Sequence, residues 1–82
     1  MAPLPDGTYD VIVVDAETAD DGDLEIDLAI TLGPHRGDVI RLRGRHVERA
    51  AASVTLGDPA LVLGVPGVLR VRQGRPTFRP EA

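Results

Sequence analysis

Between residues 24 and 32, large apolar side chains occupy every second position. They are Leu24, Ile26, Leu28, Ile30 and Leu32, and the residues between them are Glu25, Asp27, Ala29 and Thr31. Successive side chains of a strand point to opposite sides of its sheet, so this pattern predicts a strand with one buried face and one solvent-facing side. The rest of the chain must supply partners for that apolar face.

Four other segments read as strands, separated by turns rich in glycine and proline. They are Thr8–Ala16, Val39–Arg45, Val68–Arg72 and Thr77–Arg79. The first is almost continuously apolar at its centre, which predicts a strand buried on both faces or one curved so that each half serves a different face. Pro66-Gly67 and Gln73-Gly74-Arg75 are predicted turns.

One segment predicts a short helix. Asp58 is a good N-cap, Pro59 suits the first helical position, and Gly64 suits the left-handed residue that ends a helix. Residues 47–54 have helix-friendly composition but β-branched ends, so a loop with one helical turn is expected there.

The element order is three strands, a short helix and two strands, within a single domain spanning residues 1–82. Five strands around so small a helix favour a closed barrel, because closure removes exposed sheet edges. This all-β arrangement resembles the oligonucleotide/oligosaccharide-binding (OB) fold, a five-stranded Greek-key barrel with a helix between its third and fourth strands. An SH3-type barrel is the alternative. The expected core is Val11, Val13, Leu24, Ile26, Leu28, Ile30, Ile40, Leu42, Leu61, Leu69, Val71 and Phe78.

Three segments of the first half carry a second resemblance. They are Pro5-x-Gly7-x-Tyr9-x-Val11, the run from Val13 to Glu17, and Leu32-Gly33-Pro34-His35-Arg36-Gly37. They are similar to a family of small phage-borne proteins in which a strand is followed by a Gly-Pro-x-x-Gly motif and a second strand. Members of that family sit in replication and recombination gene sets. The resemblance implies an accessory role in DNA metabolism.

Charge is unevenly distributed along the chain, whose net charge is -4. Residues 1–34 hold nine carboxylates and no arginine, whereas residues 35–82 hold all nine arginines and four carboxylates. Such asymmetry is typical of nucleic-acid-binding chains. In an OB topology the third and fifth strands are neighbours, so Arg41, Arg43, Arg45 and Arg79 would form a basic stripe along a phosphate backbone. The predicted binding residues are Arg41, Arg43, Arg45, Arg70, Arg72 and Arg79.

The alternative is that the two halves pair their charges with each other. With Leu32 opposite Ile40, Asp27 would face Arg45 across the sheet, with Arg43 diagonal to it. Asp10 and Asp15 on the first strand would lie beside Arg70 and Arg72 on the fourth. The sequence leaves this alternative open. Only two aromatic residues, Tyr9 and Phe78, are present for base stacking, and core packing is the simpler account of both.

Catalytic chemistry is not expected. The chain has no cysteine and no lysine, and its one serine, Ser53, lacks a glycine elbow. His35 and His46 lie at opposite ends of one predicted strand, too far apart to share a metal ion. No cofactor is implied.

The composition therefore predicts a noncatalytic binding module. We expect a DNA-metabolism accessory protein that contacts single-stranded nucleic acid or a replication or repair protein. The alternative is a protein-interaction module, such as a small subunit or inhibitor, without nucleic-acid contact. No apolar run is long enough to span a membrane, and a cytoplasmic location is expected.

Overall fold

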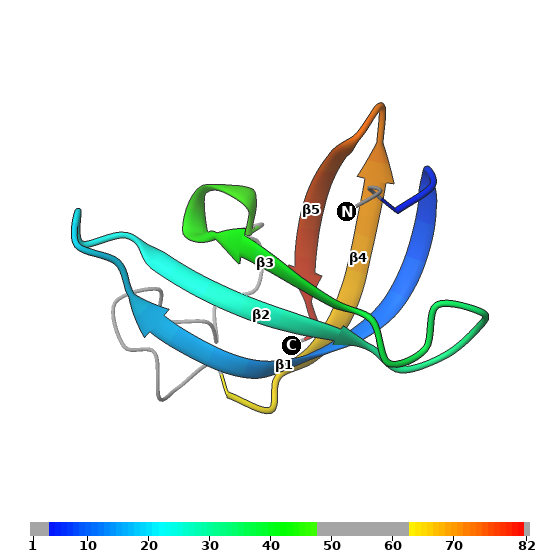
Figure 1. Cartoon of the computed structure of the whole chain (residues 1–82), viewed down its shortest axis with the longest axis horizontal. Helices are drawn as coiled ribbons and strands as arrows, with labels where there is room; N and C mark the ends of the chain where they lie inside the picture. The colour runs from blue at the N-terminus through cyan, green and yellow to red at the C-terminus, as the bar shows by residue number, and fades with distance from the viewer. Residues whose placement is uncertain (1–3, 48–62, 82) are drawn as a thin grey trace.

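The computed structural model describes residues 4–47 and 63–81. Within them lie five strands and one short 3-10 turn (Figure 1). The elements are β1 (Gly7–Thr18), β2 (Leu24–Ile30), β3 (Val39–Arg43), η1 (Gly44–His46), β4 (Pro66–Arg72) and β5 (Arg75–Pro80). The predicted five-stranded, nearly all-β architecture is confirmed in the described part of the chain.

All five strands form one antiparallel sheet in the order β3-β2-β1-β4-β5. The central strand β1 is long enough to serve two neighbours, since Gly7–Ile12 pair with β4 and Val11–Thr18 pair with β2. A bulge between Val13 and Asp15 bends β1 near that junction. The sheet therefore curls into a half-barrel, with β3 and β5 facing each other across its open side (Figure 1).

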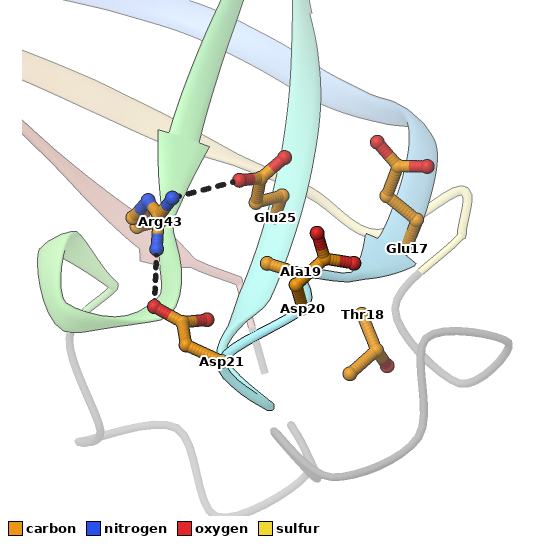
Figure 2. Close-up of a pocket in the computed structure, with 7 residues that line it drawn as sticks. All are labelled: Glu17, Thr18, Ala19, Asp20, Asp21, Glu25 and Arg43. Carbon is orange, nitrogen blue, oxygen red and sulfur yellow. Dashed lines mark hydrogen bonds and ion pairs between the residues drawn. The ribbon is translucent and has the colours of Figure 1, made fainter.

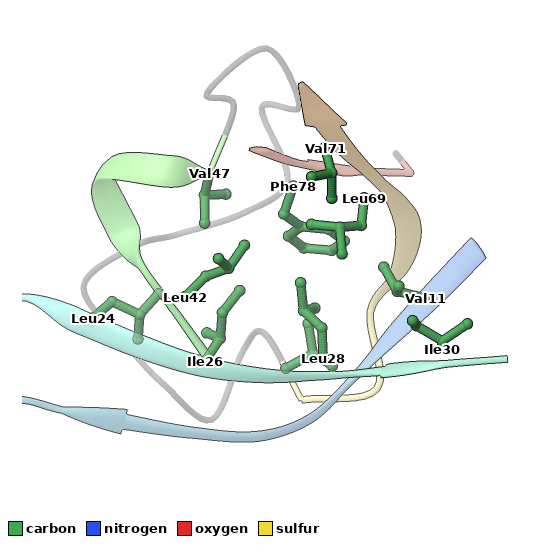
Figure 3. Packing of buried hydrophobic residues seen from close by; sticks show 11 residues of the cluster. Val11, Leu24, Ile26, Leu28, Ile30, Leu42, Val47, Leu69, Val71 and Phe78 are labelled. Atoms are coloured by element: carbon green, nitrogen blue, oxygen red, sulfur yellow. The ribbon is translucent and has the colours of Figure 1, made fainter. Parts of the chain in front are cut away.

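The core fills the concave side of the half-barrel (Figure 3). Its buried residues are Val11, Val13, Leu24, Ile26, Leu28, Ile30, Leu42, Val47, Leu69, Val71 and Phe78. The inward face predicted for the strands is thus confirmed, except that Ile40 is only half-buried and Leu32 is 62% exposed. Leu61 lies outside the described residues. Val47 was not expected in the core; η1 turns the chain so that Val47 forms a parallel bridge with Phe78 of β5.

Leu32 is exposed because β2 ends earlier than predicted. The backbone of Ile30 already closes the β2–β3 hairpin, donating to the carbonyl of Asp38 and accepting from the N–H of Gly37. Ile26 lies opposite Leu42, and Asp27 lies opposite Arg41. The predicted register, with Asp27 facing Arg45, is therefore wrong by four residues. The hairpin loop begins at Thr31 rather than at Gly33, so the turn is centred earlier in the chain than the glycine and proline signals indicated.

The first strand is not buried on both faces. Val11 and Val13 are buried, but Val14 at the bulge is 50% exposed. At the other end of the sheet, Pro66-Gly67 begins β4 and is not a turn. Gly67 lies against the ring of Phe78, where a side chain would collide with the neighbouring strand. Its role is close strand packing, which a sequence-based reading mistakes for turn chemistry.

The predicted helix lies largely outside the described residues. Its last two positions, Leu63 and Gly64, form a turn, and Gly64 has a left-handed φ of 79°. The N–H of Gly64 donates to the carbonyl of Val13, which carries the chain back onto β1 at the start of β4.

The outer edge of β5 offers few backbone N–H donors to another strand. The N–H of Glu81 donates to the carbonyl of Pro66, so the odd-numbered residues of β5 direct their N–H groups toward β4. Pro76 and Pro80 occupy positions whose N–H would face away from the sheet, and proline has none to offer. Apart from the Val47–Phe78 bridge, the outer edge of β5 is therefore protected against pairing, as natural sheets require.

Candidate functional site

The structure separates the predicted arginines into two groups. Arg41 and Arg43 lie on β3, with Arg45 in η1, whereas Arg70 and Arg72 lie on β4 and Arg79 on β5. β3 and β5 are the two edges of the sheet, and Arg79 pairs with Val68 of β4. Among the described residues, only the Val47–Phe78 bridge pairs the β3 side with β5. The strand pairing therefore does not make Arg79 a neighbour of Arg41 and Arg43.

Arg41 is surrounded by carboxylates from two neighbouring strands. Its Nη1 lies 2.8 Å from Glu17 Oε1 and 2.9 Å from Glu25 Oε2, and its Nε lies 2.9 Å from Asp27 Oδ1. Hydrogen bonds from Arg41 to Asp27 and Glu17 raise the pKa of the guanidinium above its ordinary value. Arg41 is thus committed to the protein's own acids.

Arg43 continues the same network (Figure 2). Its Nη1 lies 2.7 Å from Asp21 Oδ2 and its Nη2 lies 3.2 Å from Glu25 Oε1. The pKa of Asp21 is lowered, first by the N–H that Asp23 donates to its carboxylate and then by the hydrogen bond from Arg43. The charge pairing considered as an alternative is therefore present between β2 and β3, with Arg41 in the place predicted for Arg45. Its other half is wrong in the described residues: Arg70 lies opposite Thr8, and no ion pair joins Arg70 or Arg72 to Asp10 or Asp15.

We call this network the acidic ladder: Glu17, Asp21, Glu25, Asp27, Arg41 and Arg43. In it, four carboxylates form ion pairs with only two guanidiniums, and the carboxylate of Asp20 lies beside them (Figure 2). Within residues 4–47 and 63–81, no group of three acidic or imidazole side chains has the geometry to hold a metal ion. The ladder is a net negative surface without a metal site.

A second cluster lies at the β4–β5 hairpin. Arg70 stands opposite Thr77, and Arg72 stands opposite Arg75, next to the Gln73-Gly74 turn. We call Arg70, Arg72 and Arg75 the cationic hairpin. All three are exposed, and none has a carboxylate within ion-pair distance in the described part of the chain. With Asp6, Gln73 and Thr77 they line a shallow surface depression.

The turn at the tip of this hairpin is fixed from the far end of the chain. Asp6 Oδ2 accepts the N–H of Gln73 at 2.9 Å, and Asp6 Oδ1 accepts the N–H of Gly74 at 3.3 Å. Sequence reasoning missed Asp6, Gln73, Arg75 and Thr77 as members of a site. A two-residue Gln-Gly turn would have placed Arg75 as a strand residue opposite Arg72, but the local pattern did not distinguish it from a three-residue turn.

Neither aromatic ring offers an open stacking platform. Phe78 is buried, and Tyr9 is half-buried with its hydroxyl bonded to the carbonyl of Pro5. The edge of Tyr9 meets the ring of His35 at 5.8 Å between centroids. His35 in turn lies 3.3 Å from a carboxylate oxygen of Asp38. In the described region, a base therefore has no exposed aromatic ring on which to stack.

In the described residues, no helix has the length and apolar character to cross a membrane. Comparison with known proteins gives no match: no family model, no curated protein and no solved structure is significantly similar to this chain. The two charged clusters are therefore the features of the described residues that bear on function.

Proposed function

We propose that this protein is a noncatalytic binding module that contacts single-stranded nucleic acid through the cationic hairpin. The observation that carries the proposal is the gathering of Arg70, Arg72 and Arg75 on one arm, without carboxylate partners in the described residues. Guanidinium groups suit phosphate oxygens because they donate two parallel hydrogen bonds. The acidic ladder removes Arg41 and Arg43 from this role.

The strand arrangement supports an OB-like Greek-key barrel as the scaffold. A central first strand shared by the second and fourth strands, and a parallel contact between Val47 and Phe78, are what such a barrel needs. In that fold the loop between the fourth and fifth strands is a common oligonucleotide contact. The sequence resemblance of the first half to small phage-borne proteins extends this proposal to an accessory role in DNA metabolism.

The test is a titration of a labelled single-stranded oligonucleotide at low and moderate salt. Each phosphate contact should contribute a slope of about -0.7 to log affinity against log salt, so three contacts predict a slope of about -2. Replacing Arg70 and Arg72 by Ala should weaken binding by at least about tenfold, if each contact contributes roughly 1 kcal/mol.

The matched control is Arg36→Ala with Arg45→Ala. Both arginines are exposed and lie outside the hairpin, so the proposal withdraws Arg45, which is in η1, from the binding role predicted for it. Their loss changes the net charge by the same amount. The control should retain most of the affinity. Absence of binding at low salt, or equal losses in the two double variants, would contradict the proposal.

The second candidate is a protein-interaction module, and the acidic ladder favours it. The acidic ladder has four carboxylates and only two guanidiniums, so its surface stays negative and suits a basic protein partner. Glu17→Gln and Asp21→Asn should weaken such a complex, while leaving a nucleic-acid complex unchanged or tighter. The two functions thus respond to different variants.

A further inference from the structure

We infer that Asp6 is a positioning residue for the cationic hairpin: its carboxylate holds the Gln73-Gly74 turn so that Arg72 and Arg75 face a ligand together. This inference rests on the proposed function, and it deepens it. It assigns a favourable role in anion binding to a negative charge that lines the same depression as the arginines.

Asp6 reaches the turn from a fixed position. It directly precedes Gly7, which pairs with Val71 at the end of the paired segment of β1 and β4. Its two carboxylate oxygens accept separate N–H groups, from Gln73 at 2.9 Å and from Gly74 at 3.3 Å. Asp6 and Gln73 are 67 positions apart in sequence. The carboxylate therefore ties the hairpin tip to the central strand.

The turn needs this support because its first residue suits it poorly. Gln73 has a φ of 52° and Gly74 a φ of 74°, the pair of left-handed conformations that a type I′ hairpin requires. Asparagine, aspartate or glycine is favoured at the first position, whereas glutamine lacks the short side chain that eases the left-handed region. Gln73 is the only non-glycine residue with a positive φ in the described part of the chain.

A fixed turn matters for the arginines on either side of it. Arg72 and Arg75 are the first cross-strand pair next to the turn, so the turn sets how their guanidiniums project. Ordering two long cationic side chains on binding is entropically unfavourable, and a preorganised backbone reduces that loss. Asp6 directs both carboxylate oxygens to backbone N–H groups, and it forms no ion pair with Arg70, Arg72 or Arg75 in the described residues.

The experiment uses a variant for which simple electrostatics and positioning predict opposite results. Asp6→Ala removes a negative charge from the rim of an anion site, which on charge alone should tighten oligonucleotide binding. Loss of the turn support should instead weaken it, by about threefold to tenfold, through lost preorganisation. The measurement is the affinity of the full chain for the same labelled single-stranded oligonucleotide at low salt. Affinity equal to or tighter than that of the natural chain would overturn the inference.

Two further variants separate positioning from general damage. Asp10→Ala removes a nearby carboxylate, from β1; the Asp10 side chain has no hydrogen bond to the turn, so binding should stay equal or become tighter. Asp6→Ala combined with Gln73→Asn gives an Asn-Gly turn that favours the required conformation unaided. This double variant should recover most of the lost affinity, and failure to recover it would overturn the inference.

Amide hydrogen exchange of Gln73 and Gly74 gives a readout that does not need a ligand. Both amides should exchange faster in Asp6→Ala than in the natural chain, while amides of β2 stay unchanged. If the natural chain binds no oligonucleotide, the proposed function fails, and the inference about ligand positioning fails with it. If it binds and Asp6→Ala binds as well, only the inference fails.

Discussion

Leu28 lies at the centre of the concave face and has no exposed surface, whereas Leu32, four residues further on, is 62% exposed. We predict that Leu28→Ala lowers the free energy of unfolding by about 2–5 kcal/mol, because it removes buried methyl groups and leaves a cavity. Leu32→Ala makes the same chemical change at an exposed site and should alter stability by less than about 0.5 kcal/mol. Urea denaturation of both variants checks the prediction. Equal losses would show that the inward face is misassigned.

Gly67 is the residue at which one added methyl group should matter most. A Cβ there would lie 2.6 Å from Cε1 of Phe78 and would also collide with the carbonyl of Arg79. Since backbone cannot yield as a flexible side chain does, Gly67→Ala should destabilise the protein by about 1–3 kcal/mol. Thermal unfolding measures the effect. A variant as stable as the natural chain would mean that β4 and β5 are not packed this closely.

At the scale of strands, the acidic ladder makes stability depend on pH. The pKa of Asp21 is lowered below its ordinary value of 3.8 in the folded protein, first by the N–H that Asp23 donates to its carboxylate and then by the hydrogen bond from Arg43. A lowered carboxyl pKa stabilises the fold at pH values above the unfolded pKa, and that contribution is lost as pH falls through the folded pKa. The fold should therefore lose stability as pH drops below 3.8.

Arg43→Ala tests the assignment of this pH dependence. It removes the guanidinium between Asp21 and Glu25, so the urea midpoint should fall less between about pH 6 and pH 2.5 than in the natural chain. Arg36→Ala, which removes an exposed arginine of the β2–β3 loop, is the matched control and should keep the full decrease. An identical decrease in Arg43→Ala would remove Arg43 from the explanation.

The strands also show what alternation reveals and what it leaves open. The inward positions of β2 follow from period two alone, because a face is a local property of the chain. The pairing of β2 with β3 is not local. It depends on how the loop from Gly33 to Gly37 folds, with φ of 87° and 94° at its two glycines. The sequence therefore predicted most of the buried strand residues, but it missed Val47 and placed Arg45 where Arg41 stands.

At the scale of the whole molecule, the same contrast between local sequence patterns and non-local strand pairing explains which parts of the candidate site could be predicted. The sequence showed the charge asymmetry between the two halves of the chain. It also predicted Arg70 and Arg72, though not Arg75, as binding residues. Which arginines retain a free guanidinium depends on strand order, since β2 places carboxylates beside Arg41 and Arg43. Asp6 was beyond local reasoning, because its partner Gln73 lies at the other end of the chain.

The sharing of β1 between two neighbours has a consequence for the order in which the protein can assemble. β1, β2 and β3 form a meander joined by short loops, so their pairing closes quickly once they leave the ribosome. The pairing of Gly7 with Val71 must wait until Val71 has also left the ribosome. During synthesis the N-terminal half of β1 therefore stays without its β4 partner until β4 and β5 emerge. These two strands carry Arg70, Arg72 and Arg75.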